Sequence, residues 1–227
     1  AGVKLRPHAK THKIPGVARM QLAAGAAGIA LAKTGEAETF ADAGINDIFL
    51  AYPIVGTGKA RRLLALSDRV RLSVGADSIE GARTLSEVFA PAGRTLSVML
   101  KIDCGGNRVG VLPEQALDVA RQIAGLPGIE LVGVFTHAGQ AYHAGTPEVI
   151  AAIGRHEGDA VASAAGRLRG AGLEIREVRT GRAYLIDGHL PQAELQRIAG
   201  RVLGYSYGQV DRLAQMAEGP LPGLGRR

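Results

Sequence analysis

The sequence has no tryptophan, and its 227 residues include only one cysteine, four phenylalanines and five tyrosines. The single cysteine, Cys104, excludes an internal disulfide framework and any metal site built from several thiolates. No apolar run approaches the roughly 18 residues that a membrane-spanning helix needs, and the opening residues do not resemble a signal peptide. We therefore expect a globular domain in the reducing cytoplasm, with no membrane partner.

Charge is unevenly distributed along the chain. The formal net charge is +6, from 27 basic and 21 acidic residues, and the excess lies at the two ends. Residues 1–19 hold five basic groups and no acidic group. A nucleic-acid interface typically combines a basic stripe with aromatic side chains, which are scarce here, so we expect no nucleic-acid partner. A basic opening fits a phosphate or carboxylate ligand at least as well, and a basic phosphate- or nucleic-acid-binding protein stays as an alternative.

Short apolar segments alternate with longer stretches that carry apolar residues at helical spacing. This alternation predicts parallel strands joined by right-handed helical crossovers and buried on both faces. It favours an α/β fold of the (β/α)8-barrel (TIM barrel) type over an open doubly wound sheet, since no glycine-rich dinucleotide fingerprint follows the first strand. The expected strands are Val3–Arg6, Gly28–Ala32, Asp47–Ala51, Arg71–Gly75, Leu96–Asp103, Ile129–Thr136 and Leu173–Val178.

The alternation stops near residue 180, and no convincing eighth strand follows. No linker rich in proline or serine divides the chain. We predict one barrel domain over residues 1–180, incomplete at both ends, followed by a divergent and mostly helical tail over residues 181–227.

Residues capable of chemistry gather where the expected strands end, which is where barrel enzymes place their active sites. Lys10 lies among Arg6, His8, His12 and Lys13. A lysine amine in a positively charged and partly desolvated neighbourhood can form a Schiff base with an aldehyde. The alternative for this cluster is a basic surface turn.

Several blocks of this sequence resemble, in order and spacing, the D-threonine aldolase and D-serine dehydratase group of the alanine-racemase-like, fold type III pyridoxal-phosphate enzymes. The resemblance covers residues 3–178 and implies a barrel that binds pyridoxal phosphate. The blocks are Leu5–Lys13, Gly25–Ile29 with Gly35–Glu38, Asp47–Pro53, Lys101–Gly110 and Gly133–Gly139.

The resemblance also implies roles for individual residues. Lys10 would form the Schiff base with the cofactor and then act on the substrate Cα proton, whereas Lys13 would be structural or electrostatic. Arg108 would approach the phenolic oxygen of the cofactor, where a guanidinium stabilises negative charge. His137 would lie against the pyridine ring, and Tyr142 would reach substrate or cofactor from the same loop.

The resemblance weakens after the seventh expected strand. Only Thr180 and Gly181 match a phosphate-binding loop, and helix N–H groups there could take a phosphate. Full-length relatives have a second, β-rich domain whose ligands hold a divalent metal (Mn or Zn) that handles the substrate β-hydroxyl. We expect this chain to lack that domain and to carry no metal ligands, which puts lyase activity of this chain alone in question.

The resemblance therefore predicts a pyridoxal-phosphate-dependent lyase of D-amino acid metabolism that acts on small D-β-hydroxy amino acids as a homodimer. The reaction would be aldol cleavage to glycine and an aldehyde, or elimination of water to a 2-oxo acid and ammonia. The alternatives are a non-catalytic pyridoxal-phosphate-binding protein and an inactive, truncated member of the family.

Overall fold

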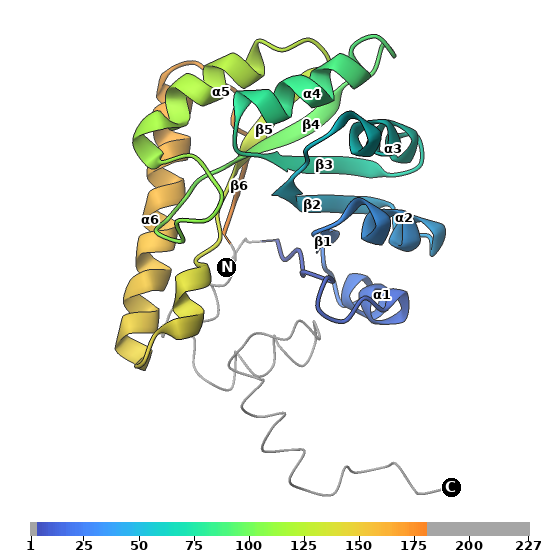
Figure 1. Ribbon diagram of the computed structural model, residues 1–227. Coiled ribbons are helices and arrows are strands. Elements are labelled where there is room, and N and C mark those ends of the chain that lie inside the picture. Colours follow the sequence, from blue (N-terminus) through green and yellow to red (C-terminus); the bar gives the residue numbers. More distant parts are fainter. Residues whose placement is uncertain (1–3, 181–227) are drawn as a thin grey trace, which may run out of the picture.

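A computed structural model describes residues 4–180, in which six parallel strands form one curled sheet with helices on its outer face (Figure 1). The strands neighbour one another in chain order. They are β1 (Ile29–Leu31), β2 (Asp47–Pro53), β3 (Arg71–Ala76), β4 (Leu96–Lys101), β5 (Ile129–Phe135) and β6 (Glu177–Arg179). The helices of this part of the chain are α1 (Pro15–Ala23), α2 (Thr34–Asp42), α3 (Thr57–Ser67), α4 (Ile79–Phe89), α5 (Ala116–Ala124) and α6 (Pro147–Gly170), with short 3-10 turns η1 (Pro113–Gln115) and η2 (Gly139–His143).

Alternate residues of each strand face opposite sides of the sheet, and residues on both sides are buried. In β4, Val98 and Leu100 belong to the large core beneath the helices. Met99 joins Phe49 and Phe135 in a smaller cluster on the inner, concave side. The rings of Phe49 and Phe135 meet edge to face with centroids 5.0 Å apart, an arrangement that favours aromatic pairing.

The predicted α/β class and the parallel, barrel-type strand order are confirmed: the chain forms a curled half-barrel. Two of the helices are followed by a glycine in the left-handed region. Gly44 and Gly172 adopt φ angles of 82° and 85° after α2 and α6, a conformation that ends helices and that glycine adopts without a steric penalty.

The first expected strand, Val3–Arg6, is wrong in its position. Residues 4–7 form no strand, and the pairing with β1 lies further along, as a parallel bridge between His8 and Ala30. The Ala9 N–H donates to the Ala30 carbonyl at 2.8 Å, and the Ala30 N–H donates to the Pro7 carbonyl at 2.7 Å. Pro7 has no N–H to donate, which limits the backbone pairing of this segment with the sheet.

The last expected strand is displaced too, because β6 spans Glu177–Arg179 rather than Leu173–Val178. Residues 173–176 leave the turn after α6 and approach the sheet only at Arg176, whose N–H donates to the Val132 carbonyl at 2.9 Å. The expected helical tail over residues 181–227 lies outside the described residues.

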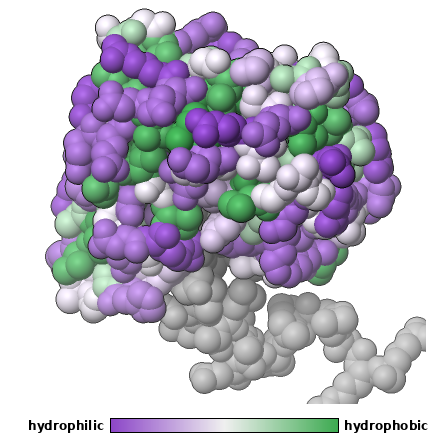
Figure 2. Space-filling view, turned by 45° about the horizontal axis from the view of Figure 1, so that its top comes forward, coloured by the Kyte–Doolittle hydropathy of each residue, from purple (hydrophilic) through white to green (hydrophobic). Residues whose placement is uncertain are grey.

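Among residues 4–180 no helix is long and apolar enough to span a membrane. On the face shown in Figure 2, hydrophobic side chains lie scattered among hydrophilic ones. Single exposed apolar residues are ordinary on protein surfaces and do not by themselves indicate a docking site.

Candidate functional site

Basic side chains from three segments come together at the carboxyl edge of the sheet. His8 lies beside β1, Lys101 ends β4 and His137 lies two residues after the end of β5. The charges of Lys10, His137 and Lys101 all lower the pKa of the His8 imidazole. The strand ends therefore gather an electropositive group around the concave side of the half-barrel.

The segment that carries Lys10 is held at both of its ends. Arg6 donates to the Asp47 carboxylate at 2.6 Å at the start of β2, and the Ala9 N–H bonds to β1. The Lys10 N–H then donates to Nδ1 of His8 at 3.4 Å. Backbone pairing and an ion pair thus fix the turn from which the Lys10 side chain extends.

His8 is neutral at physiological pH. Burial, together with the neighbouring charges of Lys10 and His137, lowers the pKa of its imidazole to about 3. A neutral imidazole accepts a hydrogen bond on one nitrogen, as the contact with the Lys10 N–H requires.

Lys101 is a buried amine within this group. The residue is 4% exposed, and its Nζ lies 5.4 Å from the centre of the Phe135 ring. Burial lowers the pKa of Lys101, and the charge of Arg108 acts in the same direction. The ring face offsets part of the cost of burying the ammonium group, so Lys101 adds positive charge inside the half-barrel.

Arg108 lies on an exposed loop that Asp103 organises. One oxygen of the Asp103 carboxylate accepts hydrogen bonds from the N–H groups of Gly105, Gly106 and Asn107 at 2.9, 2.8 and 3.2 Å. Hydrogen bonds to a charged acceptor are stronger than neutral ones. The carboxylate thereby fixes the turn that leads to Arg108, whose charge lowers the pKa of Lys101.

Replacing Asp103 with alanine is expected to lower the free energy of unfolding by about 2 kcal/mol, because three N–H groups lose a charged acceptor. Asp103→Asn keeps an acceptor oxygen at the same place and serves as the matched control, with a smaller loss. Urea unfolding of both variants measures this difference. Equal stabilities of the two variants would contradict the role given to the carboxylate.

His137 and Tyr142 form an aromatic wall at the end of β5. Their ring centroids lie 5.8 Å apart with 56° between the planes, and Tyr142 is 37% exposed. A hydrogen bond joins the turn after His137 to α6, since the Ala138 N–H donates to the fully buried Glu157 carboxylate at 3.0 Å.

The loops after β4 and β5 are tied to each other. The Thr136 hydroxyl donates to the Ile102 carbonyl at 2.8 Å, and the Gln140 amide donates to the Cys104 carbonyl at the same distance. Cys104 itself is 2% exposed. Burial raises the pKa of its thiol, which leaves it a small buried filler rather than a nucleophile.

Within residues 4–180, no three histidine, cysteine, aspartate or glutamate side chains come together as a set of metal ligands. The described residues therefore do not fit a divalent metal.

A model of the alanine racemase N-terminal domain matches residues 1–186 of this chain. The chain belongs to the alanine racemase N-terminal domain family. The D-threonine aldolase of an Arthrobacter species is 36% identical over 180 residues, which cover 79% of this chain and 48% of that protein. The D-threo-3-hydroxyaspartate dehydratase of a Delftia species is 38% identical over 183 residues, with the same shares of 79% and 48%.

A solved structure agrees with these relatives. The D-threonine aldolase from Filomicrobium marinum superposes with a TM-score of 0.77 at 36% identity, over 82% of this chain and 51% of that one. This alanine racemase N-terminal domain thus spans about half the length of the aldolase and dehydratase relatives.

The structure places the predicted site residues of the alanine racemase N-terminal domain as follows. The charges of Lys10 and His137 both lower the pKa of His8, and the charge of Arg108 lowers the pKa of Lys101. The ring of Tyr142 lies against that of His137. Thr180 follows β6 directly, and Gly181 lies outside the described residues.

Lys13 is set apart from the gathered group. Its amine lies 3.4 Å from the Glu36 carboxylate of α2, in line with the structural or electrostatic role expected for it.

Two residues of this site escaped the sequence analysis. Lys101 enters the sequence comparison only as the first residue of the block Lys101–Gly110. A lone lysine that ends an apolar strand is nevertheless a signal for a buried charge. Glu157 carries no such signal, because a glutamate within a polar helix is ordinarily exposed.

The neutral state of His8 predicts how stability depends on pH. In the unfolded state the imidazole of His8 takes up a proton near its ordinary pKa of 6.5, whereas in the folded state it resists protonation down to about 3. The unfolded state then binds more protons, so stability falls as the pH falls through this window, by up to about 1.4 kcal/mol per pH unit.

We expect His8→Gln to flatten this fall, as followed by urea unfolding at several pH values. His143→Gln, at an exposed position of η2, is the matched control and keeps the original slope. Identical slopes for His8→Gln and the unmodified chain would show that His8 is not responsible.

Proposed function

We propose that this chain binds pyridoxal phosphate through Lys10 and acts as a lyase on small D-β-hydroxy amino acids. The observation that carries the proposal is the convergence of Lys10 with His8, Lys101 and His137 at the carboxyl edge of a half-barrel. Similarity to a D-threonine aldolase and a D-threo-3-hydroxyaspartate dehydratase supports the reaction class.

The residues present fit an anionic, aromatic cofactor. Lys101 and Arg108 supply positive charge, which attracts a phosphorylated ligand. The ring of His137, with Tyr142 beside it, supplies an aromatic face against which a pyridine ring can lie. When bound, pyridoxal phosphate supplies the electron sink that stabilises a carbanion at the substrate Cα.

The side chains of the chain itself then have distinct tasks. Lys10 would hold pyridoxal phosphate covalently, and its amine would move the proton at the substrate Cα. Neutral His8 accepts the Lys10 N–H and so orients the turn that carries this lysine. Arg108 stabilises negative charge on the bound cofactor. No step is assigned to a metal, since the described residues present no ligand set.

The test is product analysis with the purified chain and pyridoxal phosphate, using D-threonine, D-serine and D-threo-3-hydroxyaspartate, each with and without added manganese or zinc. Glycine and an aldehyde would identify aldol cleavage, and a 2-oxo acid with ammonia would identify elimination of water. The L-enantiomers are the matched controls and should not react. Cofactor binding without turnover of any D-substrate would contradict the lyase and favour the non-catalytic binding protein.

A further inference from the structure

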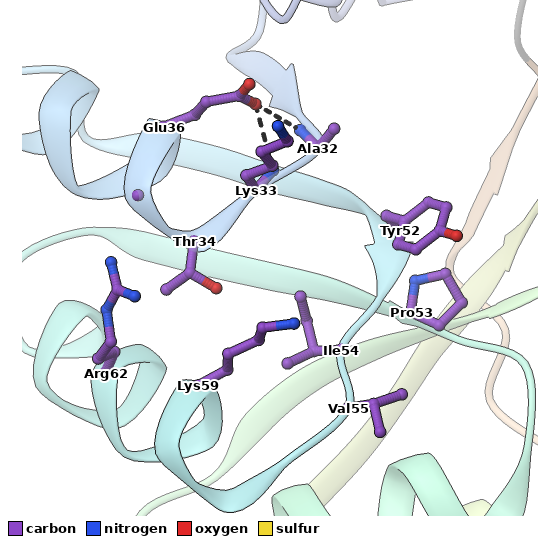
Figure 3. Close-up of a pocket in the computed structure, with 11 residues that line it drawn as sticks. Ala32, Lys33, Thr34, Glu36, Tyr52, Pro53, Ile54, Val55, Lys59 and Arg62 are labelled. Carbon is purple, nitrogen blue, oxygen red and sulfur yellow. Dashed lines mark hydrogen bonds between the residues drawn. The ribbon is translucent and has the colours of Figure 1, made fainter.

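A cavity lies between the amino-terminal ends of α2 and α3 (Figure 3). Its volume is about 620 Å³, within the range of small-molecule sites. The residues after β1 and β2 line it, and none of the residues assigned to the cofactor does so. It is therefore a separate space on the same rim of the half-barrel.

Two of the charged residues that line this cavity are already engaged. The Arg62 guanidinium donates to the Glu38 carboxylate at 2.7 Å. The Glu36 carboxylate accepts the N–H groups of Ala32 and Lys33 at 3.0 and 3.2 Å, as the dashed lines in Figure 3 show.

The other two charged residues that line the cavity are Lys33 and Lys59, and they give it an excess of positive charge. Both are exposed, and neither forms an ion pair with a carboxylate within residues 4–180. Each stands near the amino-terminal end of a helix, α2 for Lys33 and α3 for Lys59. The helix dipole there adds to the attraction for an anion.

The Thr34 hydroxyl is an independent sign of a ligand. Thr34 is 5% exposed, and its Oγ1 has no hydrogen-bond partner within the part of the chain that the structure describes. Figure 3 shows this hydroxyl and the Lys59 side chain directed toward the same space. A buried hydroxyl without a partner is costly, and an acidic ligand oxygen would accept its proton.

The wall beside these polar groups is apolar. Tyr52 and Val55 line the cavity and are 43% and 67% exposed, whereas Ile54 is buried beneath them. Apolar area left open next to the amines of Lys33 and Lys59 suits a ligand with an apolar body and an acidic head.

We propose that this cavity binds a small amphiphilic anion, with a phosphate or carboxylate head at Lys33, Lys59 and Thr34 and an apolar body against Tyr52 and Val55. The site does not depend on the reaction proposed at Lys10. The phosphate and the carboxylate share the same recognition chemistry, and the experiment separates them.

The experiment is an NMR titration of the labelled full chain, loaded beforehand with pyridoxal phosphate and freed of excess. The probes are phenyl phosphate, benzoate and inorganic phosphate. We expect saturable shifts of the Thr34, Gly35 and Lys59 amides with a Kd below about 1 mM for at least one aromatic probe. A response to phenyl phosphate alone identifies a phosphate head, and a response to benzoate alone identifies a carboxylate head.

Three variants decide whether the shifts report this site. Lys59→Gln should raise the Kd about tenfold and Thr34→Val about fivefold, since each removes a hydrogen-bond donor to a charged head. Thr34→Val should also raise the Tm of the ligand-free chain by about 2 °C, because it removes the buried unpartnered hydroxyl. Arg83→Gln, an exposed charge on α4 outside the cavity, is the control and should leave the Kd unchanged.

No saturable shift at these amides, or a Kd that Lys59→Gln and Thr34→Val leave unchanged, would overturn the proposal. Because the readout is specific to each residue, failure of cofactor binding at Lys10 does not affect it.

Discussion

Lys10→Gln is expected to lose covalent attachment of pyridoxal phosphate and to lower turnover of the D-substrate by at least about 10³-fold, because no other group replaces a lysine that both holds the cofactor and moves a proton. The Ala9–Ala30 hydrogen bond and the bond from the Lys10 N–H to His8 hold the turn that carries this lysine. The visible absorbance of the loaded protein and the rate of product formation measure the two effects.

Lys13→Gln is the matched control, since it removes the same charge from the same turn. The Lys13 amine is directed to Glu36, so this variant should keep the cofactor and most of the activity. Circular dichroism establishes that both variants fold. A Lys10→Gln protein that still forms the absorbing adduct, or a Lys13→Gln protein that loses it, would contradict the assignment.

Gly133→Ala is expected to lower the free energy of unfolding by about 3 kcal/mol or more, since overpacking against backbone cannot be relieved by moving a side chain. Gly133 pairs with Glu177 where β5 meets β6. A Cβ built at Gly133 would lie 2.2 Å from the Glu177 carbonyl oxygen and 2.9 Å from the Met99 side chain. The variant would have to push β6 away from the sheet.

Gly158→Ala, within α6, is expected to raise the free energy of unfolding. Nothing lies within 4 Å of a Cβ at Gly158, and alanine in a helix interior stabilises by roughly 0.5–1 kcal/mol relative to glycine. Urea unfolding of the two variants should therefore show changes of opposite sign. A Gly133→Ala protein as stable as the unmodified chain would contradict the close pairing of β5 and β6.

Much of the fold could be predicted because its signals are local. Consecutive apolar residues such as Val98–Leu100 indicate a strand buried on both faces, and strands that alternate with helices indicate parallel pairing. The position of the first pairing could not be read this way, since it depends on where the segment around Pro7 meets β1. Tertiary contact, and not local pattern, decides that register.

The same division holds for the candidate site. Residues at strand ends, such as Lys10 and His137, could be singled out because barrel architecture brings strand ends together. The buried amine of Lys101 and the support of Ala138 by Glu157 depend on which side of a strand or helix faces inward in three dimensions. The Thr34 hydroxyl is noticeable only once its burial and its lack of a partner within residues 4–180 are known.

The most direct test of the central claim is to incubate the purified chain with pyridoxal phosphate, reduce it with borohydride and map the modified peptide. Reduction fixes the cofactor on the lysine that holds it. We expect one modified residue, Lys10, with loss of the visible absorbance of the unreduced adduct. An adduct confined to Lys13, one spread over several lysines, or no adduct at all would contradict it.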